Sequence, residues 1–489
     1  MLATVTMQND AQRQLIDAVH ARFGARTAIT DRDAIAPWLT DWRGRFHGEA
    51  VAILAPEDRE GVATIVGMAH DLGVALVPQG GNTSMVGGAT PPADGSALIL
   101  SLKRMNRVRS IDPAGGLAIA EAGVILSVLH DAAGAKAMRF PLTLGAKGSA
   151  TIGGLVSTNA GGTQVLRWGT MRSLVAGVEA VLPDGSVHDG LAALKKDNRG
   201  YDIDQLLIGA EGTLGIVTAA ALRLAPAIAA RAVAWVGVAS PHRALALLRF
   251  FERRTQAVES FEIIPASGLA HVLAHIPDTR APLAGHHAWH LLVEAVASDP
   301  DDEPPVALLE RLLAEAHESQ LIEDATVSTS ETQAEAFWRI RDSLSEAERA
   351  QGPAVQHDIS VPVDRMPDFL IDAATAAMAR YPGTDATGFG HLGDGNVHFH
   401  VRAPAGADPV DWYAQEAPGI TRFVHDLVVA AGGSISAEHG IGQMKLRELT
   451  RLGPPSRMAA LTAIKRAFDP SNLMNPGKLV TLAPMPRDQ

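Results

Sequence analysis

Three glycine-rich segments constrain most what this chain can fold into, and they lie at 78–88, 141–162 and 207–218. A short apolar stretch, a helical pattern and a second short apolar stretch lead directly into the first segment, over 51–77. This order of strand, helix, strand and glycine loop predicts a mixed fold of the α/β or α+β class. Because glycine has no Cβ, clustered glycines let the backbone approach a ligand closely.

The first segment matches neither of two common nucleotide-binding motifs. It lacks the Lys-Ser/Thr ending of a P-loop and the Gly-x-Gly-x-x-Gly spacing of a Rossmann fold. Taken alone, it also fits a flexible surface loop. The three segments together offer many backbone N–H groups and small hydroxyls, which suit a pyrophosphate. They predict an extended dinucleotide laid across one domain.

A second informative segment lies at 389–400, where histidines lie among glycines typical of turns. If 396–401 is a strand, alternation places Asn396, His398 and His400 on one face and apolar residues on the other. The glycine turn before it would fold His391 back towards His398. With Glu438 these imidazoles would supply three N/O ligands and an open position, as in catalytic metal sites. His439 would then serve as a proton acceptor, although ordinary loop histidines remain the alternative.

Length and composition narrow the remaining choices. A chain of 489 residues exceeds one ordinary core, so two or three domains are expected. The net charge of −12 and the lack of a basic run make a nucleic-acid partner unexpected. The absence of cysteine excludes disulfides and thiolate chemistry. No secretory signal pattern or membrane span is visible, so we expect a soluble cytoplasmic protein.

Periodicity predicts further elements along the chain. Helices are expected over 10–23, 242–253, 305–317, 331–350, 409–431 and 454–468, and strands over 97–102, 117–121, 232–238 and 290–297.

Taken together, the glycine segments, the histidine segment and the Asn-Pro-Gly-Lys at 475–478 resemble one family over about 45–480. They are similar to the FAD-linked D-2-hydroxyacid dehydrogenases of the vanillyl-alcohol-oxidase/PCMH flavoprotein superfamily, nearest to the D-2-hydroxyglutarate and D-lactate branch. The resemblance implies an α+β protein. Residues 1–226 would form a PCMH-type FAD-binding domain of two α/β subdomains, and 227–430 a substrate-binding cap domain with an antiparallel sheet and helices. Residues 431–489 would return to the FAD domain.

The resemblance also implies the cofactor contacts. It assigns the FAD pyrophosphate to Pro78, Gly80, Gly81, Asn82, Thr83 and Ser84, and the rest of FAD to Pro141, Gly148, Ser149, Thr151, Gly153, Gly154, Asn159, Gly161, Gly162, Gly212, Ile216 and Asn475. Relatives that bind FAD covalently carry a histidine where this chain has Asn82, and no cysteine is present. We therefore expect FAD to be bound non-covalently.

On the substrate side, the resemblance maps a divalent metal, expected to be Zn²⁺, to the ligands His391, His398 and Glu438, and the catalytic base to His439. Arg341 matches the arginine that binds a substrate carboxylate. Further substrate contacts would come from Ser345, Gln356, Asn396 and His400. Two of these depart from the hydroxyglutarate pattern, because Gln356 replaces a usual Lys and His400 a usual Asn. Weaker binding of a distal carboxylate is therefore expected.

The implied reaction is oxidation of a D-2-hydroxyacid, such as D-2-hydroxyglutarate or D-lactate, to a 2-oxoacid with hydride transfer to the flavin. The resemblance suggests an electron-transfer flavoprotein or a quinone as the acceptor, and it leaves a homodimer open. Three other readings stay open at this point: a flavin oxidase that uses O₂, a metal-dependent hydrolase, and a non-catalytic nucleotide-binding module.

Overall fold

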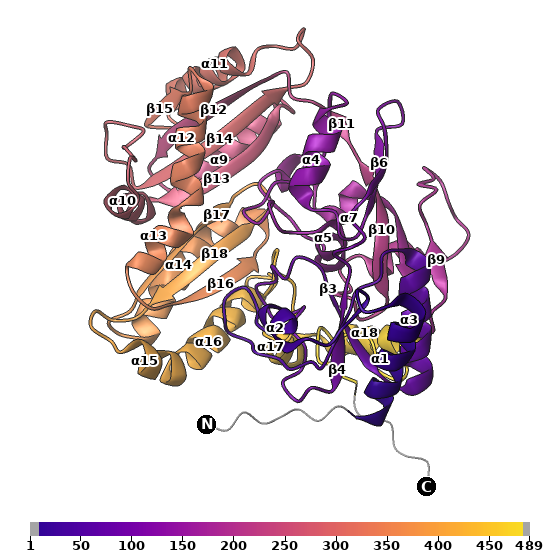
Figure 1. Ribbon diagram of the computed structural model, residues 1–489. Helices are drawn as coiled ribbons and strands as arrows, with labels where there is room; N and C mark the ends of the chain where they lie inside the picture. The colour runs from indigo at the N-terminus through magenta and orange to yellow at the C-terminus, as the bar shows by residue number, and fades with distance from the viewer. Residues whose placement is uncertain (1–8, 483–489) are drawn as a thin grey trace. The chain divides into compact units, whose positions relative to one another are not determined.

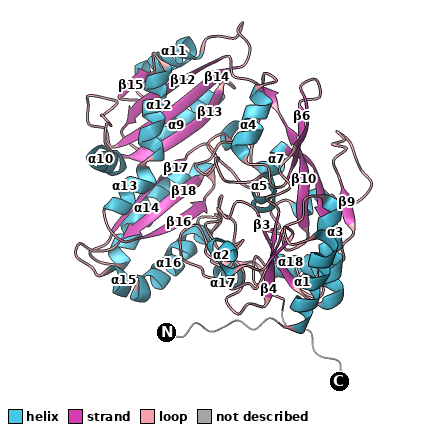
Figure 2. Cartoon of the chain, in the orientation of Figure 1, coloured by secondary structure: helices cyan, strands magenta, loops and turns pink. Residues whose placement is uncertain are grey.

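The computed structural model describes residues 9–482, which divide into two compact units (Figure 1). The first unit comprises Met1–Ala160, Thr170–Ala225 and Glu438–Gln489. The second comprises Gly161–Gly169 and Pro226–Ala437. Helices and strands alternate through both, as the colours of Figure 2 show, so the chain has the mixed architecture that its sequence predicts.

The first unit begins with a four-stranded sheet in the order β1-β2-β4-β3. β3 (Ala75–Gln79) runs parallel to β4 (Ala97–Ser101) and leads directly into the first glycine segment. The helices α1 (Asp10–Phe23) and α3 (Arg59–Leu72) pack their apolar residues into the same core as these strands. α3 ends at Gly73, which adopts the left-handed conformation (φ 66°) that glycine tolerates without strain.

A five-stranded antiparallel sheet, ordered β5-β6-β10-β8-β9, completes the first unit. The C-terminal segment returns to the first sheet, where Met474 forms a parallel bridge with Leu76. The buried Lys465 ammonium holds this return in place, because it donates to Asp469 and to the Met474 carbonyl oxygen. The remaining elements of this unit are β1 (Ala28–Ile29), α2 (Arg32–Ile35), η1 (Ala36–Trp38), β2 (Ile53–Leu54), β5 (Val108–Asp112), β6 (Leu117–Glu121), α4 (Leu126–Gly134), β7 (Met138–Arg139), α5 (Ile152–Thr158), α7 (Met171–Leu174), β8 (Val175–Val181), β9 (Val187–Asp189), α8 (Ile203–Leu207), β10 (Ile216–Arg223), α17 (Leu446–Leu452) and α18 (Pro455–Phe468).

The second unit is built on a seven-stranded antiparallel sheet in the order β15-β12-β14-β13-β17-β18-β16. One face packs against four helices: α9 (Pro241–Glu252), α11 (Pro305–Glu318), α14 (Met366–Arg380) and α16 (Ala417–Ala430). The other face packs against α10 (Ala266–His275), α12 (Glu331–Asp342) and α13 (Leu344–Ala350). The strands are β12 (Ala230–Val238), β13 (Val258–Pro265), β14 (Trp289–Ala297), β15 (Asp324–Val327), β16 (Ala354–Ser360), β17 (Asp385–His391) and β18 (Asn396–Arg402). The unit also contains the short helices α6 (Val165–Trp168), η2 (Val363–Arg365) and α15 (Pro409–Gln415). The strand β11 (Ala225–Pro226) spans the boundary of the two units in the sequence.

Two long helical predictions are wrong in their continuity. The expected helix 331–350 is two helices that separate at Ser343, and the expected helix 409–431 breaks at Glu416. Pro418 lies in the first turn of α16, where a residue without a backbone N–H begins a helix rather than continuing one. The short apolar stretch that begins at 51 forms a strand only over Ile53–Leu54.

Among the described residues, no helix combines the length and apolar character that crossing a membrane requires.

The interior of the second unit predicts an acid-sensitive stability. His290 on β14 is buried and its Nδ1 accepts a hydrogen bond from the Trp235 indole at 3.2 Å. Burial, reinforced by the nearby His287, lowers the pKa of His290 to about 4. A depressed folded-state pKa stabilises the fold above the unfolded value of 6.5, and this stability is lost as pH falls from 6.5 towards 4. The full effect is about 3 kcal/mol.

We expect His290→Gln to weaken this pH dependence, because a glutamine amide oxygen accepts from Trp235 but does not titrate. The measurement is the urea unfolding midpoint of both proteins at pH 7 and pH 4.5. An equal loss of stability in the two proteins between these pH values would contradict the assignment.

Candidate functional site

The hairpin of β17 and β18 forms the centre of the candidate site. The strands pair in the register that places His391 opposite Asn396, so the turn 392–395 does fold His391 back. The ring centroids of His391 and His398 are 5.7 Å apart. The turn requires glycine at Gly395, because its φ is +79° and a Cβ would lie 2.1 Å from the Val361 carbonyl oxygen.

The predicted alternation along β18 is confirmed. Val397, Phe399 and Val401 are fully buried in the core beneath α14 and α16. Asn396 and His398 point to the opposite face, which is the face that carries α12 and α13. Strand geometry thus collects the polar residues on one side.

The donor set of the predicted metal ligands suits a divalent cation. The ligand atoms of His391, His398 and Glu438 all lie within 4.8 Å of one another. Glu438 directly follows Ala437, the last residue of the second unit, and His439 comes next. Asp358, Glu438 and His439 form a second group with equally close ligand atoms. Two imidazoles and a carboxylate are the ligand types of catalytic Zn²⁺ sites.

A buried carboxylate that the sequence analysis missed connects two of these residues. Glu262 on β13 accepts a hydrogen bond from Arg341 Nε at 2.7 Å, and its other oxygen lies 2.7 Å from His391 Nδ1. Burial alone would raise the pKa of Glu262, but the charges of Arg341 and His391 outweigh it and lower this pKa. Arg341 is therefore a paired arginine of α12 that is largely shielded from solvent, with a side chain that is 12% exposed.

The predicted substrate contacts fall near the same hairpin. Register places Gln356 on β16 directly opposite His400 on β18. His400 is buried, with its ring 5.2 Å from that of Phe389. The Asn396 amide donates to Asp358 and to the Ile359 carbonyl oxygen, and its own buried oxygen has no protein partner. Ser345 lies on α13 and is half-buried.

In the first unit the three glycine segments meet one another. A Cβ on Gly81 would lie 2.0 Å from the Ser149 carbonyl oxygen, and one on Gly80 would lie 2.1 Å from Thr151 Oγ1. A Cβ on Gly212 would lie 2.4 Å from the Pro78 ring. These glycines therefore let the segments pack closely on each other. Gly154 differs, because it is exposed and its Cβ would meet nothing nearer than 3.5 Å.

Two residues of these segments and one of the C-terminal segment leave buried oxygens without a protein partner: Asn82 Oδ1, Thr151 Oγ1 and Asn475 Oδ1. Each belongs to the predicted cofactor contacts, and each is suited to hydrogen bonding with a polar ligand. The other predicted contacts of this unit lie in the three glycine segments: Thr83, Ser84, Pro141, Gly148, Gly153, Asn159 and Ile216. Gly161 and Gly162 begin the part of the second unit at 161–169.

Glu211, which directly precedes the predicted cofactor residue Gly212, is a second carboxylate that the sequence analysis missed. Its side chain accepts from the backbone N–H groups of Ile441 and Gly442, both at 2.7 Å. Its backbone oxygen accepts from the Asn475 amide, which also donates to the Gly88 carbonyl oxygen. Burial raises the pKa of Glu211. Glu211 thus fixes the segment that directly follows Glu438 and His439.

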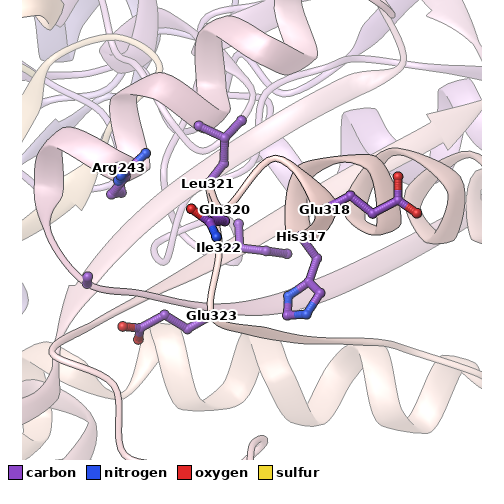
Figure 3. A pocket seen from close by; sticks show the side chains of 8 residues that line it. Arg243, His317, Glu318, Gln320, Leu321, Ile322 and Glu323 are labelled. Carbon is purple, nitrogen blue, oxygen red and sulfur yellow. The ribbon is translucent and has the colours of Figure 1, made fainter.

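An open depression of about 560 Å³ lies elsewhere in the second unit (Figure 3). Arg243, His317 and Glu323 are among the residues that line it. None of the predicted site residues contributes to it.

Two sequence families match the chain. Residues 50–190 match the FAD binding domain family, and residues 228–479 match FAD linked oxidases, C-terminal domain. The chain is 33% identical over 462 residues to the mitochondrial D-2-hydroxyglutarate dehydrogenase of Arabidopsis thaliana, covering 94% of this chain and 80% of the relative. It is 35% identical to the D-2-hydroxyglutarate dehydrogenase of Xanthomonas citri pv. viticola, covering 90% of this chain and 91% of the relative.

Solved structures agree on the fold. A substrate-bound p-cresol methylhydroxylase matches 96% of this chain and 97% of its own chain, with a TM-score of 0.73 and 15% identity. The 4-ethylphenol oxidase of Gulosibacter chungangensis matches with a TM-score of 0.69 and 19% identity, over 96% of this chain and 97% of its own. At these identities the likeness concerns the fold, and it confirms the expected PCMH-type architecture.

One expectation is overturned by the relatives. The sequence predicted a cytoplasmic protein, but the relatives from Arabidopsis thaliana, Bos taurus and Danio rerio are named as mitochondrial enzymes. The cytoplasmic prediction is therefore wrong. It rested on missing signal patterns, and an absence of that kind does not identify a compartment.

The predicted family of the chain is confirmed. The family match covers 228–479 of the chain, and the identity to curated relatives extends over most of both sequences. The chain belongs to the FAD-linked oxidases, in the branch that contains the D-2-hydroxyglutarate dehydrogenases.

Proposed function

We propose that this protein is an FAD-dependent dehydrogenase that oxidises D-2-hydroxyacids to 2-oxoacids with the help of a divalent metal. The observation that carries the proposal is the cluster of buried and half-buried side chains on one face of the second unit's sheet. There His391 and His398 lie side by side, and Arg341 contacts the His391 ring at 3.3 Å. The names of the curated relatives supply the substrate class.

Each residue has a role that its chemistry supports. His391, His398 and Glu438 hold Zn²⁺, which supplies Lewis acidity to the substrate hydroxyl. Arg341 binds the substrate carboxylate by charge-assisted hydrogen bonds. His439 accepts the hydroxyl proton. FAD, bound non-covalently by the glycine segments, supplies the two-electron acceptor for the reaction.

Different parts of the chain are proposed to bind the cofactor and the substrate. Residues 1–226 and the C-terminal segment 431–489 bind FAD, and 227–430 bind the substrate. An electron-transfer flavoprotein or a quinone would serve as the electron acceptor. A flavin oxidase that uses O₂ would need the same residues, but the relatives' names favour the dehydrogenase. The hydrolase and the non-catalytic module lose support, because both halves of the chain match FAD-linked families.

The metal role is tested by His398→Ala, with His242→Ala as the matched control. His242 is a histidine of the same unit whose side chain is 56% exposed. We expect His398→Ala to lose bound Zn²⁺ and turnover of D-2-hydroxyglutarate while it retains FAD, and His242→Ala to behave as wild type. The measurements are metal content, flavin absorbance and turnover with a dye acceptor. Full turnover by metal-free protein would refute the metal role.

The cofactor assignment predicts opposite effects of one substitution on stability and on FAD binding. Gly154 lies exposed on α5, so Gly154→Ala should stabilise the apoprotein by up to about 1 kcal/mol through helix propensity. The same methyl group should weaken FAD retention if α5 faces the cofactor. Gly134→Ala, at the end of α4 where a Cβ meets nothing within 4 Å, is the control.

FAD content after gel filtration and the unfolding midpoint separate the two effects of Gly154→Ala. Equal FAD content in Gly154→Ala, Gly134→Ala and wild type would show that FAD does not contact Gly154.

Substrate preference should respond to Gln356, which faces His400 across the sheet. A lysine there adds a fixed positive charge for a distal carboxylate. We expect Gln356→Lys to improve kcat/KM for D-2-hydroxyglutarate relative to D-lactate by about 1.5–3 kcal/mol, the strength of a hydrogen bond to a charged group. An unchanged ratio would show that position 356 does not contact the distal group.

A further inference from the structure

Glu262 is the residue in the second unit whose placement is hardest to explain by stability alone. It lies in β13, where its strand neighbours Phe261 and Ile263 belong to the apolar core. It is 1% exposed, yet it carries a carboxylate. An ionised group is costly to bury unless partners satisfy it, so its partners indicate what it does.

Both partners belong to the proposed catalytic constellation. Strand pairing aligns Glu262 with His391 on the neighbouring strand β17, and one carboxylate oxygen lies 2.7 Å from His391 Nδ1. The other oxygen accepts from Arg341 Nε at 2.7 Å, across from α12. A single carboxylate therefore contacts a metal-ligand candidate and a substrate-binding candidate.

These contacts have a chemical consequence for each partner. A carboxylate at Nδ1 fixes the His391 tautomer with the proton on Nδ1, so that Nε2 keeps its lone pair for a metal. The bond to Nε restricts the Arg341 guanidinium and holds its Nη2 3.3 Å from the His391 ring, so the guanidinium lies beside the metal-ligand candidate. The same side chain thus orients both groups.

We propose that Glu262 is a positioning residue that sets the His391 tautomer for metal binding and orients Arg341 for the substrate carboxylate. This inference rests on the proposed function. In this proposal Glu262 does not contact the substrate.

The test compares Glu262→Gln with Glu294→Gln in the FAD-loaded protein. Glu294 on β14 is also buried, and it secures the same helix α12 through the Trp338 indole at 2.7 Å. It is paired in the strand register with residues of β12 and β13 rather than with His391. Both substitutions remove one buried charge that secures α12, so a purely structural role predicts similar effects.

We expect Glu262→Gln to lower Zn²⁺ affinity by about 10–100-fold, the range for groups behind a metal ligand, and to raise KM for D-2-hydroxyglutarate. Glu294→Gln should change the unfolding midpoint while metal affinity and KM stay at wild-type values. Zn²⁺ affinity is measured by competition with a chromogenic chelator. Equal metal affinity and KM in the two variants would overturn the inference and leave the proposed function intact, whereas a wild type that binds no Zn²⁺ would overturn both.

A measurement on the wild type keeps the inference testable if Glu262→Gln does not fold. ¹⁵N-histidine NMR, with the His391 signals assigned by comparison with His391→Gln, should show His391 protonated on Nδ1. A proton on Nε2 in the metal-free protein would contradict the role of Glu262.

Discussion

The position of β18 between β16 and β17 is the constraint on which the second unit's site depends. Because β18 pairs in register with β16 and β17, side chains alternate between the two faces of the sheet in the same way in all three strands. Val397 and Phe399 enter the core on one face, so the polar partners must lie on the other. Gln356, His398 and His391 therefore collect on that face without any residue leaving its strand geometry. A shift of one residue would exchange the two faces.

The first unit is organised by close contacts between segments that are far apart in the sequence. Gly81 against Ser149 and Gly212 against Pro78 bring the glycine segments together. The Asn475 amide and the Glu211 carboxylate then tie the C-terminal return to them. Glu211 and Ile441 are 230 residues apart in the sequence, yet this contact within the first unit sets the geometry of the segment after Glu438.

Elements with a strong local period could be predicted from the sequence. Helices α1, α9 and α11 and strand β18 lie where periodicity places them, within one or two residues. The two histidines among the metal candidates were also predictable, because turn glycines and alternation act over only a few residues. The breaks near Ser343 and Glu416 were missed because an apolar pattern continues across two consecutive helices that pack on the same core.

The two buried carboxylates could not be found in this way. Glu262 stands in a buried strand and is 129 residues from His391 and 79 from Arg341, so no local spacing links them. The role of the glycine segments differs in part from the prediction. Their glycines suggested close approach of a ligand, and several of them instead meet another segment of the chain. In each case the role of the residue depends on a contact with a residue far away in the sequence, and that contact is seen only in the folded structure.

The central claim is that the FAD of this protein is reduced by D-2-hydroxyacids in a metal-dependent reaction. The most direct test mixes the purified FAD-loaded protein anaerobically with D-2-hydroxyglutarate and follows the flavin absorbance. We predict rapid loss of the oxidised flavin spectrum with the D enantiomer, none with the L enantiomer, and none with either after Zn²⁺ has been removed by a chelator. A flavin that stays oxidised with every D-2-hydroxyacid would contradict the proposed reaction, and equal reduction before and after chelation would contradict the role of the metal.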